Sequence, residues 1–347
     1  MRLSRSYTAV EVHAEGEQGT CYVGSVFDVP GTTMADKLRH VNEVDDSIRR
    51  FLCYEPRGRP QASANVVFPS SVPEADAGFI VLQADRAHAM SGSNTICVVT
   101  ALLETGTIAM REPETVVVLE TAAGIVRATA TCHDGRCERV TFDGVASFVE
   151  VLDVPLDVPG VGAITVDVAY GGCYYVLVDA AQLGLHLTRA AARDVVDAAT
   201  AVSVAARASI SVQHPTVPEI DFLSYVMVVG DDDPRRGRLR GATVLSGRVD
   251  RSPCGTGNAA RLACLAARGL ARAGDRFVAT SLIDSEFVVE MIGVTTVGNR
   301  PAVLPRISGR GWVVGTRTAA IDPTDPYQRG FVLSDVWGTE IANGESA

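Results

Sequence analysis

Two short segments of this 347-residue chain place a small nucleophilic side chain directly before a glycine and a long apolar run. Ser91 is followed by GSNTICVVTALLET, and Cys254 is followed by GTGNAARLACLAAR. Both runs are typical of helices, and the residue before a helix lies beside unpaired backbone N–H groups and the positive end of the helix dipole. That position binds anions and lowers the pKa of a thiol from about 8.5. We therefore expect Cys254 to accept protons, and Ser91, a far weaker acid, to be a proton donor, a relay or the anchor for a water.

The two segments follow the same pattern beyond their first residues. After the glycine each has a hydroxyl residue, Ser93 or Thr256, and each has a glycine at the sixteenth position, Gly106 or Gly269. A helix commonly ends at a glycine in the left-handed region. A Ser, Thr or Cys before a helix is often only a cap, but two matching motifs about one domain apart indicate an internal duplication with a shared chemical purpose.

The rest of the chain consists mostly of short β-branched and aromatic runs between turn residues, and the two apolar helices must be buried. A chain of this length suits two domains. We expect an α/β fold of the α+β kind, with two similar lobes, each a curved β-sheet or barrel around a central helix, and an active site in the cleft. Residues 1–170 plus 331–347 are expected to form the lobe with Ser91, and residues 171–330 the lobe with Cys254.

The composition excludes several kinds of partner. A net charge of -10 argues against nucleic acid, which needs a concentrated basic surface. Because no apolar run is long enough to span a bilayer and the N-terminus has no signal-like segment, we expect a cytoplasmic protein with no membrane partner.

The eight cysteines have no regular spacing, which favours reduced thiols over disulfides. Cys132-His-Asp-Gly-Arg-Cys137 reads as a hairpin turn, and we expect no metal.

No cofactor is expected either. Lys37 is the only lysine beside 30 arginines, and a pyridoxal enzyme needs a Schiff-base lysine. The segment 254–260 fits a G-x-G-x-x-A dinucleotide fingerprint, but Arg251-Ser-Pro253 stands where a buried strand should lead in. The expected partner is a small-molecule imino acid, for the reason that follows.

Ser252-Pro-Cys-Gly-Thr-Gly257, preceded by Asp250 and Arg251, resembles the second catalytic motif of the proline racemase family, and Met90-Ser-Gly-Ser-Asn-Thr95 resembles its first. Further matching segments span nearly the whole chain: Glu55-Pro-Arg-Gly58, Asp76-Ala-Gly-Phe79, Tyr170-Gly-Gly172, His214-Pro215 and Asp325-Pro-Tyr-Gln-Arg-Gly330. The resemblance implies two lobes of the diaminopimelate epimerase type and cofactor-independent chemistry at the α-carbon of an imino acid.

In that family two side chains flank the α-carbon, one removing its proton and the other supplying one, while both helix starts hold the carboxylate. The resemblance implies these acid and base roles for Ser91 and Cys254. Asp250 is implied as a partner of the ring nitrogen. Substrate contacts are implied for five residues in all: Gly92, Ser93, Asp250, Gly255 and Thr256.

Two departures from the family pattern direct the expected reaction toward hydroxyprolines. Ser91 stands where proline racemases have Cys, and Ser93 where many members have His. Pairs with one hydroxyl resemble the hydroxyproline enzymes, and a Ser/Cys pair suits removal of one α-proton with protonation of a leaving 3-hydroxyl. We therefore expect a trans-3-hydroxy-L-proline dehydratase that forms Δ1-pyrroline-2-carboxylate. A 4-hydroxyproline 2-epimerase, or one enzyme with both activities, is the alternative.

Two hypotheses of other classes stay open. One is a cysteine hydrolase that pairs Cys254 with His214 or another histidine, and the other is a non-catalytic imino-acid-binding protein. The sequence also leaves open which side chain removes the proton from the L-substrate. It does not decide the oligomeric state, a homodimer included.

Overall fold

The structure is a computed structural model that describes residues 3–218, 220–245, 247–338 and 341–342. The chain divides into two compact units, one of residues 1–142 with 309–347 and one of residues 143–308. These boundaries lie earlier along the chain than those expected from the sequence. The first boundary moves because the hairpin β9–β10 (Ser147–Val158 and Gly162–Tyr170) pairs with β11 (Tyr174–Asp179) and β17 (Arg300–Gly309) of the second unit. The second moves because β18 (Gly311–Ile321) pairs with β1 (Arg5–Ala14) of the first unit.

The first unit is built on a mixed sheet in the order β18-β1-β2-β3-β4-β6-β7-β8. Neighbours are antiparallel except for β2 with β3 and β4 with β6, which are parallel. The two-residue strand β5 pairs with the end of β4. The strands are β1 (Arg5–Ala14), β2 (Glu17–Tyr22), β3 (Ala62–Phe68), β4 (Ala77–Leu82), β5 (Ala87–His88), β6 (Glu114–Thr121), β7 (Gly124–His133), β8 (Arg136–Asp143) and β18 (Gly311–Ile321).

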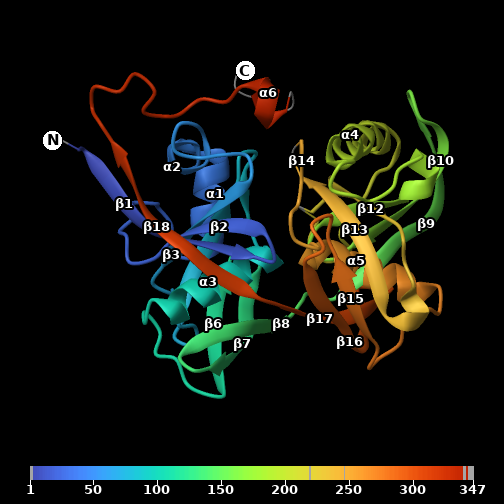
Figure 1. The fold of residues 1–347 in the computed structure, drawn as a ribbon, viewed down its shortest axis with the longest axis horizontal. Coiled ribbons are helices and arrows are strands. Elements are labelled where there is room, and N and C mark those ends of the chain that lie inside the picture. The colour runs from blue at the N-terminus through green and yellow to red at the C-terminus, as the bar shows by residue number, and fades with distance from the viewer. Residues whose placement is uncertain (1–2, 219, 246, 339–340, 343–347) are drawn as a thin grey trace. The chain divides into compact units, whose positions relative to one another are not determined.

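Helix α3 (Gly92–Glu104) is the central helix of this unit, and it contacts β1, β2, β3 and β18 (Figure 1). Its residues Gly92 to Leu103 are all buried, because the helix is apolar around its whole circumference. The remaining helices are α1 (Met34–Glu43), α2 (Ser47–Cys53) and α6 (Ser334–Trp337). Helices α1 and α2 contact β4, and they share a core with β3 and β4 that is separate from α3.

The second unit closes into a barrel in the order β9-β10-β11-β12-β13-β15-β16-β17 and back to β9. Helix α5 (Gly255–Ala267) contacts β9, β10, β11 and β16, while α4 (Ala192–Ser209) contacts β9, β12 and β13 and joins a different core cluster (Figure 1). The strands not yet given are β12 (Leu223–Val229), β13 (Arg238–Leu245), β14 (Arg248–Val249), β15 (Arg276–Thr280) and β16 (Glu286–Val297), with 3₁₀ turns η1 (Ala180–Leu183) and η2 (Pro234–Arg236).

The two units repeat one topology, which confirms the duplication expected from the sequence. Each has the same sequence of antiparallel and parallel pairs, and in each a two-residue strand, β5 or β14, leads to the central helix. Both central helices are followed by the expected left-handed glycine, Gly106 with φ of 69° and Gly269 with φ of 70°.

The 18-residue helix α4 was not expected, because its many alanines give no strongly apolar stripe. Within the described ranges, no helix combines the length and apolar character needed to cross a bilayer.

Candidate active site

The start of α3 presents the hydroxyl of Ser91 without using it to cap the helix. Ser91 is the extended N-cap residue, with φ of -150°, and its side chain accepts no backbone N–H of the first turn. Its Oγ instead accepts a hydrogen bond from Nδ2 of Asn94 at 2.9 Å and lies 3.4 Å from Oγ of Ser93. Asn94 Oδ1 in turn accepts from Nδ2 of Asn65 at 2.9 Å. A chain of two buried amides therefore fixes the serine oxygen as an acceptor.

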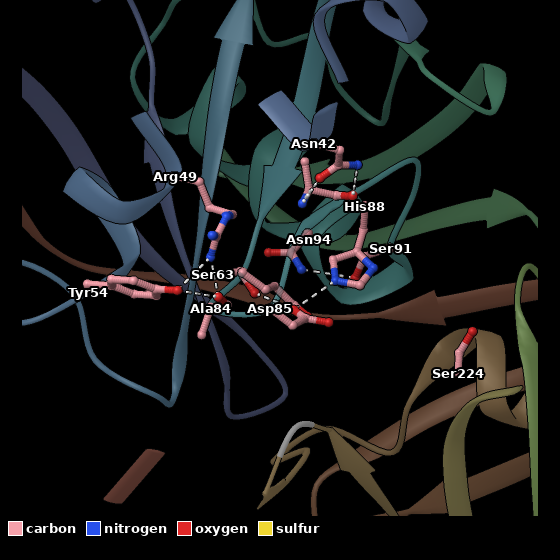
Figure 2. Close-up of polar contacts among 12 residues, drawn as sticks. Asn42, Arg49, Tyr54, Ser63, Ala84, Asp85, His88, Ser91, Asn94 and Ser224 are labelled. Carbon is pink, nitrogen blue, oxygen red and sulfur yellow. Dashed lines mark hydrogen bonds and ion pairs between the residues drawn. The ribbon is translucent and has the colours of Figure 1, made fainter. Parts of the chain in front are cut away.

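The segment that leads to Ser91 carries a contact between a histidine and an aspartate. His88 Nε2 lies 3.2 Å from Oδ1 of Asp85, and the two side chains are 20% and 28% exposed (Figure 2). Burial alone would raise the pKa of the Asp85 carboxyl, but His88 and the backbone N–H of Arg86 lower that pKa overall. Asn42 holds both the N–H and the C=O of Ala87, so the backbone before the helix is fixed.

The start of α5 holds Cys254 more tightly. Cys254 has a φ of 68°, which is unusual for a residue other than glycine, and its thiol caps the helix by accepting the N–H of Gly257 at 3.3 Å. The hydroxyl of Tyr175 lies 3.4 Å from the sulfur and 2.7 Å from Oγ1 of Thr256. Cys254 is 5% exposed and is therefore a buried residue.

The expectation of a lowered thiol pKa is wrong for this structure. Burial raises the pKa of Cys254 to about 12, and the carboxylate of Asp250 adds to the rise. Hydrogen bonds from Tyr175 and the Gly257 N–H lower the pKa by less than burial raises it. The Cys254 thiol therefore carries its proton at neutral pH.

Asp250 lies in the segment that leads to Cys254, and its carboxylate is held by hydrogen bonds. Its Oδ1 accepts hydrogen bonds from the backbone N–H and the hydroxyl of Ser252, at 2.8 and 2.9 Å. The Ser252 hydroxyl also accepts the N–H of Cys254 at 3.2 Å. Ser252 therefore links the buried carboxylate to the backbone N–H of Cys254.

The Tyr170-Gly-Gly172 motif packs directly on the first turn of α5. A Cβ on Gly171 would lie 2.2 Å from the backbone oxygen of Thr256 and 2.4 Å from the backbone nitrogen of Ala260. Only glycine allows the strand to approach the helix so closely. This contact fixes the position of the helix start relative to β10 and β11.

The site residues expected from the sequence thus form two groups. The first unit brings Ser91, Gly92 and Ser93 together, and the second brings together the other four, Asp250, Cys254, Gly255 and Thr256. The sequence missed Asn94, the pair Asp85 and His88, and Tyr175. Alternation along β11 could have separated Tyr175 from Tyr174, whose hydroxyl donates to Glu150 instead.

The contacts of His214 indicate a role in packing and in the local loop structure. Its ring packs against Phe148 and Tyr170, and its Nδ1 accepts the N–H of Thr216 at 3.3 Å. Among the described residues, the contact partners of His214 and Cys254 do not overlap. The hydrolase hypothesis, which needs a thiol–imidazole pair, therefore finds no support in the second unit.

Two other candidate groups also have structural roles. Lys37 Nζ donates to the carbonyl oxygens of Val29 and Gly31, both at 2.8 Å. Cys132 and Cys137 face each other in the β7–β8 hairpin, and all eight cysteines are free thiols. In the part of the chain that the structure describes, no group of three or more His, Cys, Asp or Glu side chains could hold a metal ion.

Comparisons with known proteins agree with these motifs. Residues 9–332 match the model of the family described as proline racemase. A 4-hydroxyproline 2-epimerase of Rhizobium etli is 50% identical over 97% of this chain and 98% of its own, and one of Agrobacterium fabrum is 47% identical over 99% and 100%. A crystal structure of a hydroxyproline epimerase from Agrobacterium vitis with bound trans-4-hydroxy-L-proline has a TM-score of 0.92, with 49% identity over 99% of this chain and 100% of that one. This chain belongs to the proline racemase family.

Proposed function

We propose that this protein is a 4-hydroxyproline 2-epimerase, which interconverts trans-4-hydroxy-L-proline and cis-4-hydroxy-D-proline without a cofactor. The observation that carries the proposal is the identity of 50% and 47%, over nearly the whole chain, to two proteins named 4-hydroxyproline 2-epimerase. The similarity to a structure that holds trans-4-hydroxy-L-proline supports the same substrate. The reaction that the Ser/Cys pair alone favours, dehydration of a 3-hydroxyproline, becomes the second candidate.

In the proposed reaction Ser91 and Cys254 lie on opposite faces of the α-carbon. The first N–H groups of α3 and α5 have no partner within their helices and hold the substrate carboxylate, where negative charge grows as the α-proton leaves. Gly92 and Gly255 allow the carboxylate to approach the backbone. Inversion follows when one face of the carbon loses its proton and the other face receives a new one.

The raised pKa of Cys254 sets the order of proton transfers in this proposal. The thiol holds its proton when the substrate arrives, so Cys254 gives a proton to one face while the Ser91 side takes a proton from the other. The reverse reaction starts from the thiolate. Asp250, already oriented by Ser252, is assigned to the ring nitrogen, which is positively charged in the substrate.

Dehydration remains a candidate because the Ser91 position carries a hydroxyl rather than a thiol. A protonated Cys254 could give its proton to a leaving 3-hydroxyl instead of to the α-carbon. The two reactions differ in product, since dehydration gives a cyclic imine and epimerisation conserves the ring and its substituent.

The test is to incubate the enzyme separately with trans-4-hydroxy-L-proline and trans-3-hydroxy-L-proline. Chiral chromatography measures the D-epimer, and o-aminobenzaldehyde detects the pyrroline. We expect the 4-hydroxy compound to approach an equilibrium mixture with kcat/KM at least tenfold above that for the 3-hydroxy compound. A larger kcat/KM for pyrroline formation would make dehydration the main activity, and binding of pyrrole-2-carboxylate without any turnover would indicate a binding protein.

A further inference from the structure

The phenol of Tyr175 lies between the thiol of Cys254 and the hydroxyl of Thr256. Its oxygen is 3.4 Å from Sγ of the cysteine and 2.7 Å from Oγ1 of the threonine, whereas Sγ and Oγ1 are 4.0 Å apart. Tyr175 is 1% exposed and Cys254 is 5% exposed, while Thr256 is half-buried. The threonine is therefore the least buried of the three residues, and the phenol connects it to the enclosed thiol.

The proton on Cys254 sets the direction of these hydrogen bonds. Sγ accepts the N–H of Gly257 at 3.3 Å, and the thiol carries a proton of its own. Of the two hydroxyl oxygens beside the sulfur, that of Tyr175 is the nearer acceptor for the S–H. A phenol has a single proton to donate, and that proton then goes to Oγ1 of Thr256. Because the phenol proton occupies this close contact, the hydroxyl proton of Thr256 is left to be donated to a ligand.

The side chain of Thr256 is held from two sides. A Cβ on Gly172 would lie 3.1 Å from Cγ2 of Thr256, so the methyl group packs on the backbone of that glycine. Oγ1 lies against the Tyr175 hydroxyl on the other side. Thr256 is the second residue of α5, directly after Gly255, so its hydroxyl belongs to the same helix start as the N–H groups that bind anions.

The two units make room for a polar group beside the reactive residue in opposite ways. In the second unit the helix has a glycine: a Cβ on Gly257 would lie 3.0 Å from Sγ of Cys254 and 3.2 Å from Cε1 of Tyr175. In the first unit the helix carries Asn94, and the glycine is on β2, which has the place of β11 in the repeated topology. There a Cβ on Gly19 would lie 3.0 Å from Oδ1 of Asn94. The space beside the thiol is therefore kept open by a glycine and filled by the phenol.

We propose that Tyr175 is a positioning residue that directs the hydroxyl of Thr256 as a hydrogen-bond donor to the substrate carboxylate. This inference rests on the proposed epimerase function, in which the start of α5 holds that carboxylate. Tyr175 acts on the substrate only through Thr256, because its own hydroxyl is buried between the threonine and the thiol. A donor whose direction is fixed before the substrate arrives binds it with a smaller loss of side-chain freedom.

A double-mutant cycle on the binding of pyrrole-2-carboxylate, a planar analogue of the deprotonated substrate, tests the proposal without turnover. Isothermal titration calorimetry measures Kd. We expect Thr256→Val to raise Kd about 20-fold and Tyr175→Phe to raise it about fivefold, since a donor to a charged oxygen is lost or released from its direction. In the Thr256→Val background, Tyr175→Phe should add less than about twofold. An equal loss in both backgrounds, or no loss with Thr256 present, would overturn the proposal.

Thr256→Ser keeps the hydroxyl and serves as the second background if Thr256→Val does not fold. Its Kd should stay within about threefold of the wild type, and Tyr175→Phe should again raise it about fivefold. Loss of that sensitivity would contradict the proposal. Tyr174→Phe is the matched control, because Tyr174 donates to Glu150, and it should bind as the wild type does. A wild-type enzyme that neither binds pyrrole-2-carboxylate nor epimerises trans-4-hydroxy-L-proline would instead overturn the proposed function, so the two failures are distinguishable.

Discussion

The two central helices begin with the same pattern of residues, yet their first side chains are held in different ways. The thiol of Cys254 caps its helix through the Gly257 N–H and lies against the Tyr175 hydroxyl. The hydroxyl of Ser91 leaves the cap unused and accepts from the side chain of Asn94. The sulfur of Cys254 is therefore held in place by a backbone N–H of its own helix and one phenol. The oxygen of Ser91, at the equivalent position, is held by two linked side-chain amides.

The backbone conformations of Cys254 and Ser91 also differ. Cys254 has a φ of 68° and Ser91 a φ of -150°, so only the thiol half stores backbone strain at its reactive residue. Strain of this kind persists where the surrounding structure determines it, and here the close contact of Gly171 with α5 does so.

Removal of the thiol should have the largest effect on activity. We expect Cys254→Ala to lower kcat by at least about 10³-fold, since the proton donor on one face is lost, with little change in the midpoint of thermal unfolding. Cys264→Ala, in the buried interior of the same helix, is the control and should retain activity. Residual activity above a tenth for Cys254→Ala would contradict the assignment.

Packing at the two helix starts should respond differently to an added methyl group. Gly171→Ala would press Cβ against backbone atoms of α5 that cannot move aside, so we expect a loss of about 2–3 kcal/mol in the free energy of unfolding. Gly19→Ala meets side-chain atoms rather than backbone, Asn65 Nδ2 at 2.6 Å with Asn94 Oδ1 and Cys97 Cβ at 3.0 Å, and should cost about 1–2 kcal/mol.

Urea denaturation measures both free energies, and kcat separates the two sites further. Gly19→Ala should also lower kcat several-fold, because Asn65 supports the Asn94 amide that holds Ser91. A larger stability loss for Gly19→Ala than for Gly171→Ala would be inconsistent with the contacts described.

The two asparagines near the helix starts should separate activity from stability. Asn94→Ala removes the donor to Ser91 Oγ, and we expect kcat to fall about tenfold. Asn258→Ala leaves the carbonyl oxygens of Pro253 and Cys254 without a side-chain donor, so about 2 kcal/mol of stability should be lost with a smaller change in kcat. If both variants lose the same stability and neither changes kcat, the contrast between the halves fails.

The Tyr175 hydroxyl should have the smallest effect, through the pKa of the thiol. Its hydrogen bond lowers the pKa of Cys254, so Tyr175→Phe should raise that pKa further and reduce the thiolate fraction at any fixed pH. Alkylation of the Cys254 peptide by iodoacetamide, followed by mass spectrometry at pH 9, should slow a few-fold. In the wild type the rate should rise about tenfold per pH unit below pH 12.

Tyr174→Phe is the matched control for this measurement, because Tyr174 donates to Glu150 on the other face of β11. Its alkylation rate should equal that of the wild type. Faster alkylation of Tyr175→Phe than of the wild type would show that the phenol raises, rather than lowers, the thiol pKa.

Local patterns were sufficient to predict the central helices, their terminal glycines and the duplication. The apolar runs after Ser91 and Cys254 can only be buried helices, and a left-handed glycine ends each. Helix α4 escaped prediction because its alanines are compatible with several structures until the barrel supplies an apolar surface. The unit boundaries were displaced because the β9–β10 hairpin has no local signal of which sheet it joins.

The site was only partly predictable, since its missing members depend on contacts distant in sequence. Tyr175 reaches Cys254 across 79 residues, and Asn65 reaches Asn94 across 29. The thiol pKa was predicted in the wrong direction because the sequence shows the helix start but not the depth of burial around it.

The most direct test of the central claim, that two groups act on opposite faces of C2, is proton NMR of the reaction in D₂O. At early conversion of trans-4-hydroxy-L-proline, we expect the cis-4-hydroxy-D-proline formed to carry deuterium at C2 while the remaining substrate keeps its proton. Product that retains the original C2 proton would show that a single group moves it from one face to the other, and would contradict the assignment of Ser91 and Cys254 as a pair.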